Sequence, residues 1–240
     1  MVYRAFIFSS ANDQQQMTHQ LSTYKTIVFD CDGVVLNSNK VKVDAYFKVA
    51  KQNGGTDAQA QAFVDHHVNR GSFPRNGKIE YYLKNILQEE VTPEKIARYI
   101  QSFEDILDIT LMECEIAPGL LALKTATANA RWMLLSGGDQ TELRRIFPRR
   151  DIQNHTLADL FEEGIFGGPD LKEDVLKREM HNKNIMLPAL FIGDSKYDHQ
   201  ASTAAGLDFI FVSDWTEVPD WQAYCAQHRI TVIRNIAQLL

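Results

Sequence analysis

The stretch from Thr26 to Val35 reads Thr-Ile-Val-Phe-Asp-Cys-Asp-Gly-Val-Val, an apolar run that ends in two aspartates and a glycine. The run predicts a buried strand that ends at Asp30. Because side chains two residues apart in an extended segment point the same way, the carboxylates of Asp30 and Asp32 are expected to face one spot. Two interpretations are open: an Asp-Gly turn that ends a strand, or a site for a divalent cation and a phosphate.

Short apolar runs recur along the chain and alternate with helical patterns. The further predicted strands are 132–135, 189–192, 209–212 and 230–233, and the helices between them are 120–130, 140–147 and 171–182. The segment 164–169 is predicted to be a turn-rich crossing. This alternation predicts an α/β fold, a Rossmann-like doubly wound parallel sheet with helices on both faces. Ligands bind at the carboxyl ends of such strands, where Ser136, Asp194 and Asp198 also occur.

A block near the start of the chain has a helical pattern throughout. Helices are predicted over 41–52, 58–69 and 78–88, and a further helix starts with Thr92 as N-cap and Pro93 at its first position. We therefore expect an inserted α-helical cap domain at 39–115. The α/β core would consist of 24–38 and 116–240, preceded by a flexible lead-in at 1–23, within which Met17 is an alternative start.

Charge and cysteine content narrow the function classes. The net charge of −6, without a sustained run of Lys and Arg, argues against nucleic acid and anionic membranes as partners. The three cysteines lie far apart, which fits free thiols in a reducing compartment. No apolar stretch reaches the roughly 20 residues of a membrane span. These features predict a cytoplasmic protein and leave a small anionic substrate possible, because a site can be locally positive within an acidic protein.

Four motifs in this order resemble those of haloacid dehalogenase superfamily phosphohydrolases with a type-one helical cap, especially phosphoglycolate phosphatase and beta-phosphoglucomutase-like members. They are Asp30–Ser38 (DCDGVVLNS), Leu134–Gly137 (LLSG), Gly168–Lys172 (GPDLK) and Gly193–Asp198 (GDSKYD). The resemblance runs from about Tyr24 to Val212. Asn37 departs from the Asp of many relatives with this cap. Asp32 is present, whereas the dehalogenase branch lacks it, so phosphate chemistry is favoured over carbon–halogen cleavage.

The resemblance implies a role for each acidic residue. Asp30 would be the nucleophile that forms an aspartyl-phosphate, and Asp32 would protonate the leaving oxygen and then deprotonate water. The cofactor would be Mg²⁺, held by the carboxylates of Asp30 and Asp194 and by the backbone carbonyl of Asp32. Asp198 would orient Lys172 or a metal-bound water. As an alternative, Asp194 and Asp198 could be turn and first-turn acids stabilised by a helix dipole.

The resemblance also implies a phosphate-binding set. Ser136, the amide of Gly137 at a helix start and Lys172 would bind the phosphate oxygens. As alternatives, Ser136 could cap the helix that follows it, and Lys172 could be a solvated helix lysine.

The segment 69–78 combines glycines with basic residues between two cap helices. Arg75 and Lys78 are expected to contact the non-phosphate part of the substrate, with a solvated loop as the alternative. His66 and His67 are expected to be ordinary helix residues, because no further metal ligand lies at useful spacing.

Together these features predict a phosphatase for a small phosphorylated metabolite, with a sugar phosphate as first candidate. The alternatives are a phosphosugar mutase and a binding protein without turnover.

Overall fold

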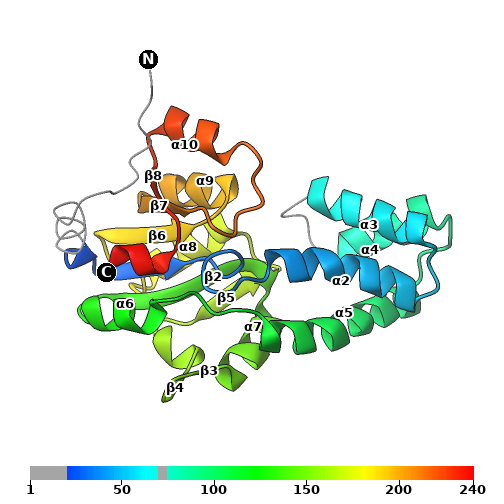
Figure 1. Ribbon diagram of the computed structural model, residues 1–240, viewed down its shortest axis with the longest axis horizontal. Coiled ribbons are helices and arrows are strands. Elements are labelled where there is room, and N and C mark those ends of the chain that lie inside the picture. Colours follow the sequence, from blue (N-terminus) through cyan, green and yellow to red (C-terminus); the bar gives the residue numbers. More distant parts are fainter. Residues whose placement is uncertain (1–20, 70–74) are drawn as a thin grey trace. The chain divides into compact units, whose positions relative to one another are not determined.

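The computed structural model describes residues 21–69 and 75–240. Its chain divides into two compact units (Figure 1). The helical insert comprises Ser38–Cys114, and the sheet unit is formed by the chain on both sides of that segment. Residues 1–20 of the predicted lead-in and 70–74 of the predicted substrate-binding segment lie outside the described residues.

Six parallel strands form the main sheet, in the order β5-β2-β1-β6-β7-β8. They are β1 Thr26–Phe29, β2 Arg131–Asp139, β5 Ile165–Gly168, β6 Ala189–Gly193, β7 Asp208–Val212 and β8 Thr231–Ile233. From central β1 the chain adds strands first on one side and then on the other, which is the order of a doubly wound Rossmann-type sheet. The predicted fold class is confirmed.

The described structure corrects the prediction at the sheet edge. Residues 165–168, predicted as part of a turn-rich crossing, form β5, which pairs with Leu134 and Leu135 of β2. Only Ile165 and Phe166 in this strand are large and apolar, and glycines flank them, so the local pattern indicated a turn. A small antiparallel hairpin, β3 Asp151–Ile152 and β4 His155–Thr156, was not predicted either.

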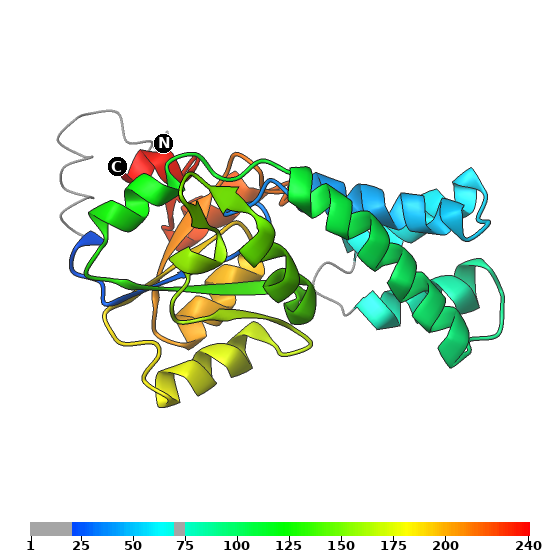
Figure 2. The same ribbon diagram turned by 90° about the horizontal axis from the view of Figure 1, so that it is seen from below.

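Helices cover both faces of the sheet. They are α6 Leu120–Ala126, α7 Gln140–Ile146, α8 Lys172–His181, α9 Lys196–Ala204 and α10 Trp221–His228, with the 3₁₀ turns η2 Phe147–Arg149, η3 Ala158–Leu160 and η4 Ile236–Leu239. Helix α6 ends earlier than predicted, because the chain must turn before β2 begins at Arg131. Figure 2 shows α8 and α9 on one side of the sheet and α6 on the other.

The core on each face explains why the strands are apolar throughout. On one face, Val28 and Phe191 belong to a buried cluster with Val175 of α8 and Ala201 of α9. On the other, the rings of Phe29 and Trp132 lie 4.3 Å apart, centroid to centroid. A parallel sheet buried on both faces needs large apolar side chains at successive positions.

The helical insert has its own aromatic core, in which the ring of Tyr46 packs against those of Phe63 and Phe103. Its elements are α2 Asn39–Gln52, α3 Asp57–Asn69, α4 Arg75–Tyr81, the π-helical turn η1 Tyr82–Ile86 and α5 Pro93–Glu113. The Thr92 side chain accepts a hydrogen bond from the backbone of Lys95, which confirms the predicted N-cap. Among the described helices, none has the length and apolar character that crossing a bilayer requires.

Candidate active site

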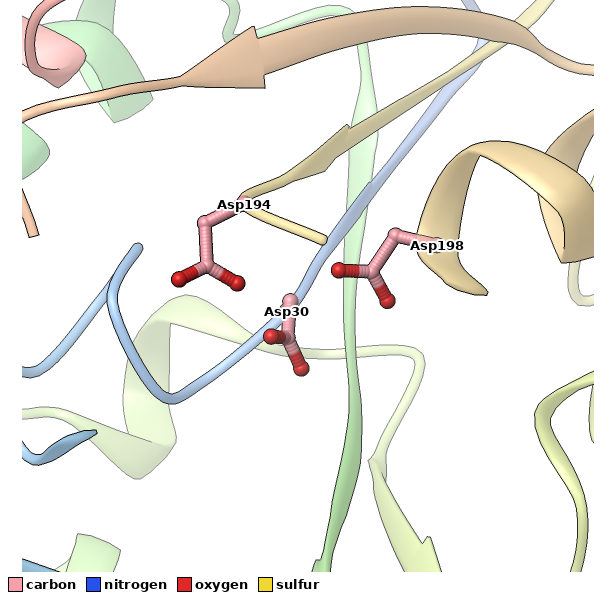
Figure 3. Close-up of side chains that lie close together, drawn as sticks. All are labelled: Asp30, Asp194 and Asp198. Carbon is pink, nitrogen blue, oxygen red and sulfur yellow. The ribbon is translucent and has the colours of Figure 1, made fainter. Parts of the chain in front are cut away.

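The first and the last of the four motifs meet at the point where the strand order reverses. Asp30 follows β1 and Asp194 follows the adjacent β6, and the backbone N–H of Asp30 donates to the carbonyl of Ile192 at 2.9 Å. In doubly wound sheets the crevice for ligands lies at such a switch point. Figure 3 shows the carboxylates of Asp30 and Asp194 leaving these strand ends, with Asp198 on the first turn of α9.

The local backbone at Asp30 turns sharply. The carbonyl of Cys31 accepts hydrogen bonds from the N–H groups of Val35 and Leu36, both at 2.9 Å, and Gly33 has a φ of 79°. That left-handed conformation favours glycine. The Cys31 side chain is buried, whereas Asp32 is half-buried. This turn therefore forms part of the site, because it holds the carboxylates of Asp30 and Asp32 beyond the end of the strand.

Lys172 lies between two carboxylates. Its Nζ is 2.8 Å from Asp30 Oδ1 and 2.5 Å from Asp198 Oδ1, and only 4% of the residue is exposed. The alternative of a solvated lysine is therefore wrong. Burial opposes the charge, but the carboxylates of Asp198 and Asp30 outweigh burial and hold the pKa of Lys172 above its ordinary value.

The environment of Asp30 raises its pKa. Burial is the main cause, and the negative charges of Asp198 and Asp32 add to it, while the Lys172 ammonium acts in the opposite direction. Asp30 is 5% exposed. Buried carboxylates whose pKa is shifted by burial and by specific charged neighbours are common at functional sites.

Asp198 caps helix α9 with one carboxylate oxygen and binds Lys172 with the other. Its Oδ2 accepts from the backbone N–H and the hydroxyl of Ser195, at 3.1 and 2.7 Å, which forms a capping box at the start of α9. Its Oδ1 accepts from Lys172. The interpretation of Asp198 as a first-turn acid is thus correct for one oxygen, and the predicted contact with Lys172 involves the other.

A divalent cation fits the donor set at this strand end. Asp30, Asp194 and Asp198 each offer a carboxylate oxygen, and these oxygens lie within 4.8 Å of one another. Carboxylates are hard ligands of the type that Mg²⁺ prefers. Because both oxygens of Asp198 accept hydrogen bonds from Lys172 and Ser195, Asp30 and Asp194 are the better pair of ligands. Within the described residues, neither His66 nor His67 belongs to a cluster of potential metal ligands.

Ser136 joins the second strand end to Asp32. Its hydroxyl donates to Asp32 Oδ2 at 3.3 Å and accepts from the backbone N–H of Gly138 at 2.9 Å. Helix α7 is capped instead by Asp139, whose side chain accepts from Glu142 N, so the capping alternative for Ser136 is wrong.

Gly137 lies in a strand and not at the helix start where its amide was expected, although the helix itself begins at Gln140 as predicted. Strand β2 continues to Asp139, and α7 begins at Gln140. Gly137 is exposed within the strand, and a Cβ at this position would meet no atom within 4 Å. Gly137 therefore lies within β2, two residues before the strand ends, and not in the first turn of a helix.

Arg75 and Lys78 lie on helix α4, where the prediction placed them on a joining segment. The guanidinium of Arg75 lies 5.2 Å from the ring centroid of Phe103. Lys78 is 2% exposed, and its Nζ lies 2.9 Å from Nδ1 of His67, whose ring stacks on Tyr46. Burial lowers the pKa of Lys78 to about 8, and the positive charge of Arg75 adds to the shift.

Two contacts of the site were missed from the sequence. The Thr216 hydroxyl donates to the backbone carbonyl of Asp194 at 2.6 Å. The Tyr197 hydroxyl accepts from the backbone N–H of Lys172 at 3.3 Å. Tyr197 lies inside the last motif and could have been considered, whereas Thr216 is in a loop without a pattern.

The arrangement can support attack by a carboxylate on an electrophile whose negative charge needs compensation. Asp30 is a buried acid 2.8 Å from the Lys172 ammonium, and Asp32 accepts a hydrogen bond from the Ser136 hydroxyl at the same edge of the sheet. Separate groups for nucleophilic attack and proton transfer, next to a fixed positive charge, are the parts that phosphoryl transfer requires.

Comparison with known proteins shows the family of the chain. None of the curated proteins matches the chain. Among solved structures, it is similar to a candidate phosphoglycolate phosphatase from Haemophilus somnus 129pt, with a TM-score of 0.65 at 17% identity over 90% of this chain and 96% of that one.

A candidate beta-phosphoglucomutase from Thermotoga maritima gives a TM-score of 0.62 at 17% identity, with 90% of this chain and 96% of that one covered. CbbY from Rhodobacter sphaeroides, solved in complex with phosphate, gives 0.63 at 17% identity with the same coverage. At these identities the likeness shows the fold. The family described as haloacid dehalogenase-like hydrolase matches residues 24–206. The chain therefore belongs to the haloacid dehalogenase-like hydrolase family.

Proposed function

We propose that the protein is a Mg²⁺-dependent phosphatase that hydrolyses a small phosphorylated metabolite, with a sugar phosphate as first candidate. The observation that carries the proposal is the placement of the Asp30 carboxylate 2.8 Å from the buried Lys172 ammonium, at the switch point of the sheet. A phosphate monoester is a dianion, so an attacking carboxylate requires positive charge around the phosphoryl group.

The reaction proceeds in two displacements. An oxygen of Asp30 attacks phosphorus, the bond to the leaving oxygen breaks, and Asp32 gives its proton to that oxygen. Asp32, now ionised, takes a proton from water as the water oxygen attacks the aspartyl-phosphate. Inorganic phosphate leaves, and Asp30 and Asp32 return to their starting states. Splitting the transfer through a covalent intermediate replaces one difficult step by two easier ones.

Several residues stabilise the transferred group. Lys172 supplies a fixed positive charge, and the Ser136 hydroxyl and the Gly137 amide bind phosphate oxygens. The carboxylates of Asp30 and Asp194 and the carbonyl of Asp32 would hold Mg²⁺, which would supply further positive charge when bound. Asp198 keeps the ammonium of Lys172 in place.

The helical insert provides the candidates for substrate selection. We propose that Arg75 and Lys78 recognise the non-phosphate part of the substrate, because they are basic residues three positions apart on α4. The partner is a small phosphorylated molecule rather than nucleic acid or a membrane, which the net charge of −6 supports. We propose a cytoplasmic location on the basis of the three free cysteines.

A phosphosugar mutase is the second candidate, and the similarity to a candidate beta-phosphoglucomutase favours considering it. It would use the same two aspartates but return the phosphoryl group to the substrate. Release of inorganic phosphate from a phosphosugar supports the phosphatase. Isomerisation of the phosphosugar without release of phosphate supports the mutase.

The decisive experiment is hydrolysis of a broad panel of phosphate esters by the purified protein with Mg²⁺. We expect turnover of at least one ester and a loss of about 10³-fold or more in Asp30→Asn. Asp174→Asn, an exposed acid on α8, is the matched control and should retain full activity. Absence of turnover across the panel, with Asp30→Asn unchanged from wild type, would instead support a binding protein without turnover.

A further inference from the structure

Two consecutive residues of α9 contact the two ends of Lys172. Asp198 accepts a hydrogen bond from the Nζ of Lys172, and Tyr197 accepts one from its backbone N–H at 3.3 Å. Lys172 is the first residue of α8. One turn of α9 therefore contacts both the backbone and the ammonium of the same lysine.

The start of α8 depends on a neighbouring helix for its hydrogen bonds. The N-cap residue, Leu171, has no side-chain oxygen and makes no capping hydrogen bond. The first N–H groups of a helix lack partners within the helix and need acceptors from elsewhere. The Tyr197 hydroxyl supplies one of these acceptors to Lys172.

A second contact orients the Tyr197 hydroxyl. Its proton is donated to Oε2 of Glu173, at 2.5 Å, which directs the oxygen lone pairs elsewhere and leaves them available to the N–H of Lys172. Burial, followed by the bond to Glu173, raises the pKa of Tyr197 to about 12. The hydroxyl thus keeps its proton at neutral pH and remains both donor and acceptor.

We propose that Tyr197 is a positioning residue, which fixes the backbone of Lys172 so that the ammonium is held between Asp30 and Asp198. This inference rests on the proposed function, in which Lys172 serves the phosphoryl group. A lysine side chain has four rotatable carbon–carbon bonds, and a fixed ammonium therefore needs a fixed backbone as well as an ion pair. Catalytic groups displaced by about 1 Å lose up to about 10²-fold in rate.

The test compares two tyrosines that make the same kind of hydrogen bond. Tyr197→Phe removes the hydroxyl and should lower kcat/KM for p-nitrophenyl phosphate by about 10-fold. Tyr24→Phe removes the hydroxyl that donates to Asp208 at 2.8 Å, before β1 and away from the strand carboxyl ends, and should leave kcat/KM unchanged. Glu173→Gln keeps an acceptor for the Tyr197 proton and should stay near wild type.

A double-mutant cycle separates positioning from a merely structural role. If Tyr197 acts through Lys172, Tyr197→Phe should have no further effect on kcat/KM in a Lys172→Met background. The inhibition constant of inorganic phosphate should likewise rise in the Tyr197→Phe single variant and not in that background. A general loss of packing would instead lower activity by the same factor in both backgrounds, and it would overturn the inference.

The proposed function and the positioning role fail in different ways. If Lys172→Met and Asp30→Asn retain wild-type turnover and phosphate inhibition, the proposed function fails and the positioning role is overturned with it. If Lys172→Met loses activity while Tyr197→Phe matches Tyr24→Phe, the positioning role alone is overturned.

Discussion

The ammonium of Lys172 lies 2.8 Å from a carboxylate oxygen of Asp30, and both groups are buried. A buried ion pair is costly to form, and removing one partner leaves an uncompensated charge. At this strand end the pair has a chemical consequence, because it keeps the candidate nucleophile beside a fixed cation. Asp198 completes the arrangement from the other side of the lysine.

Replacing Lys172 should therefore remove activity and reduce stability together. We expect Lys172→Met to lower kcat/KM by about 10²-fold or more, because a fixed charge that stabilises the transferred phosphoryl group is lost. The free energy of unfolding should also fall, because Asp30 and Asp198 lose a shared partner. Lys177→Met, at an exposed position of the same helix, is the control for both steady-state kinetics and denaturant unfolding. Equal behaviour of the two variants would contradict the role of Lys172.

The role of Asp32 predicts a dependence on the leaving group. Asp32→Asn cannot donate a proton in the same way, so hydrolysis of an alkyl phosphate should fall by about 10²-fold or more. p-Nitrophenyl phosphate has a leaving oxygen that needs little protonation, and its first displacement should be affected much less. A burst of p-nitrophenol measures this step separately from attack by water. Equal losses for both esters would argue against proton donation by Asp32.

The strand ends were predictable because each combines a short apolar run with a polar residue at its end. That pattern identifies Asp30, Ser136 and Asp194 from the sequence alone, since a doubly wound sheet brings the carboxyl ends of its strands together. Strand β5 was missed because it is short and glycine-flanked, and its strand character comes from pairing with β2. Tertiary pairing of this kind leaves little local signal.

Contacts between helices were harder to predict than the positions of the motifs. Nothing in the sequence indicates that the hydroxyl of Tyr197 meets the backbone of Lys172, because the two residues are 25 positions apart. The burial of Lys78 could not be predicted from the sequence either, since basic residues near a glycine-rich segment are usually exposed to solvent. The packing of α4 within the helical insert determines that Lys78 is buried.

The pKa of Asp30 predicts how Mg²⁺ binding depends on pH. Burial raises this pKa to about 7, and a proton on Asp30 competes with the cation. The apparent Mg²⁺ affinity should rise as the pH increases toward 7 and level off above it. Calorimetric titration with Mg²⁺ at about pH 6 and about pH 8 measures the change.

The same shift gives a stability prediction with a defined sign. The folded chain holds the Asp30 proton more tightly than the unfolded chain does, so this contribution to stability is lost as the pH rises toward 7. Mg²⁺ should offset the loss, because it binds the ionised carboxylate. Asp194→Asn serves as the control: it should weaken Mg²⁺ binding at every pH and keep the pH dependence. A Mg²⁺ affinity independent of pH would contradict the assignment of Asp30 as a ligand.

Lys78 gives the last prediction, which concerns the helical insert. Its pKa is lowered to about 8 by burial, so the folded state holds this proton less tightly than the unfolded state does. The charged lysine therefore costs stability at neutral pH, and this cost diminishes as the pH rises from about 8 toward its ordinary value. Lys78→Met should raise the free energy of unfolding by about 1–3 kcal/mol, despite the lost bond to His67.

Lys84→Met, at an exposed position of the same insert, should leave both stability and kinetics unchanged. Denaturant unfolding at about pH 7 measures the stability difference between the two variants. If Lys78 also recognises the substrate, Lys78→Met should raise KM for the best substrate of the ester panel while it stabilises the fold. Such a trade between stability and substrate binding is characteristic of functional groups held in unfavourable surroundings. A more stable variant with unchanged KM would remove Lys78 from the substrate-recognition set, and a less stable variant would show that its buried contacts outweigh the cost of its charge.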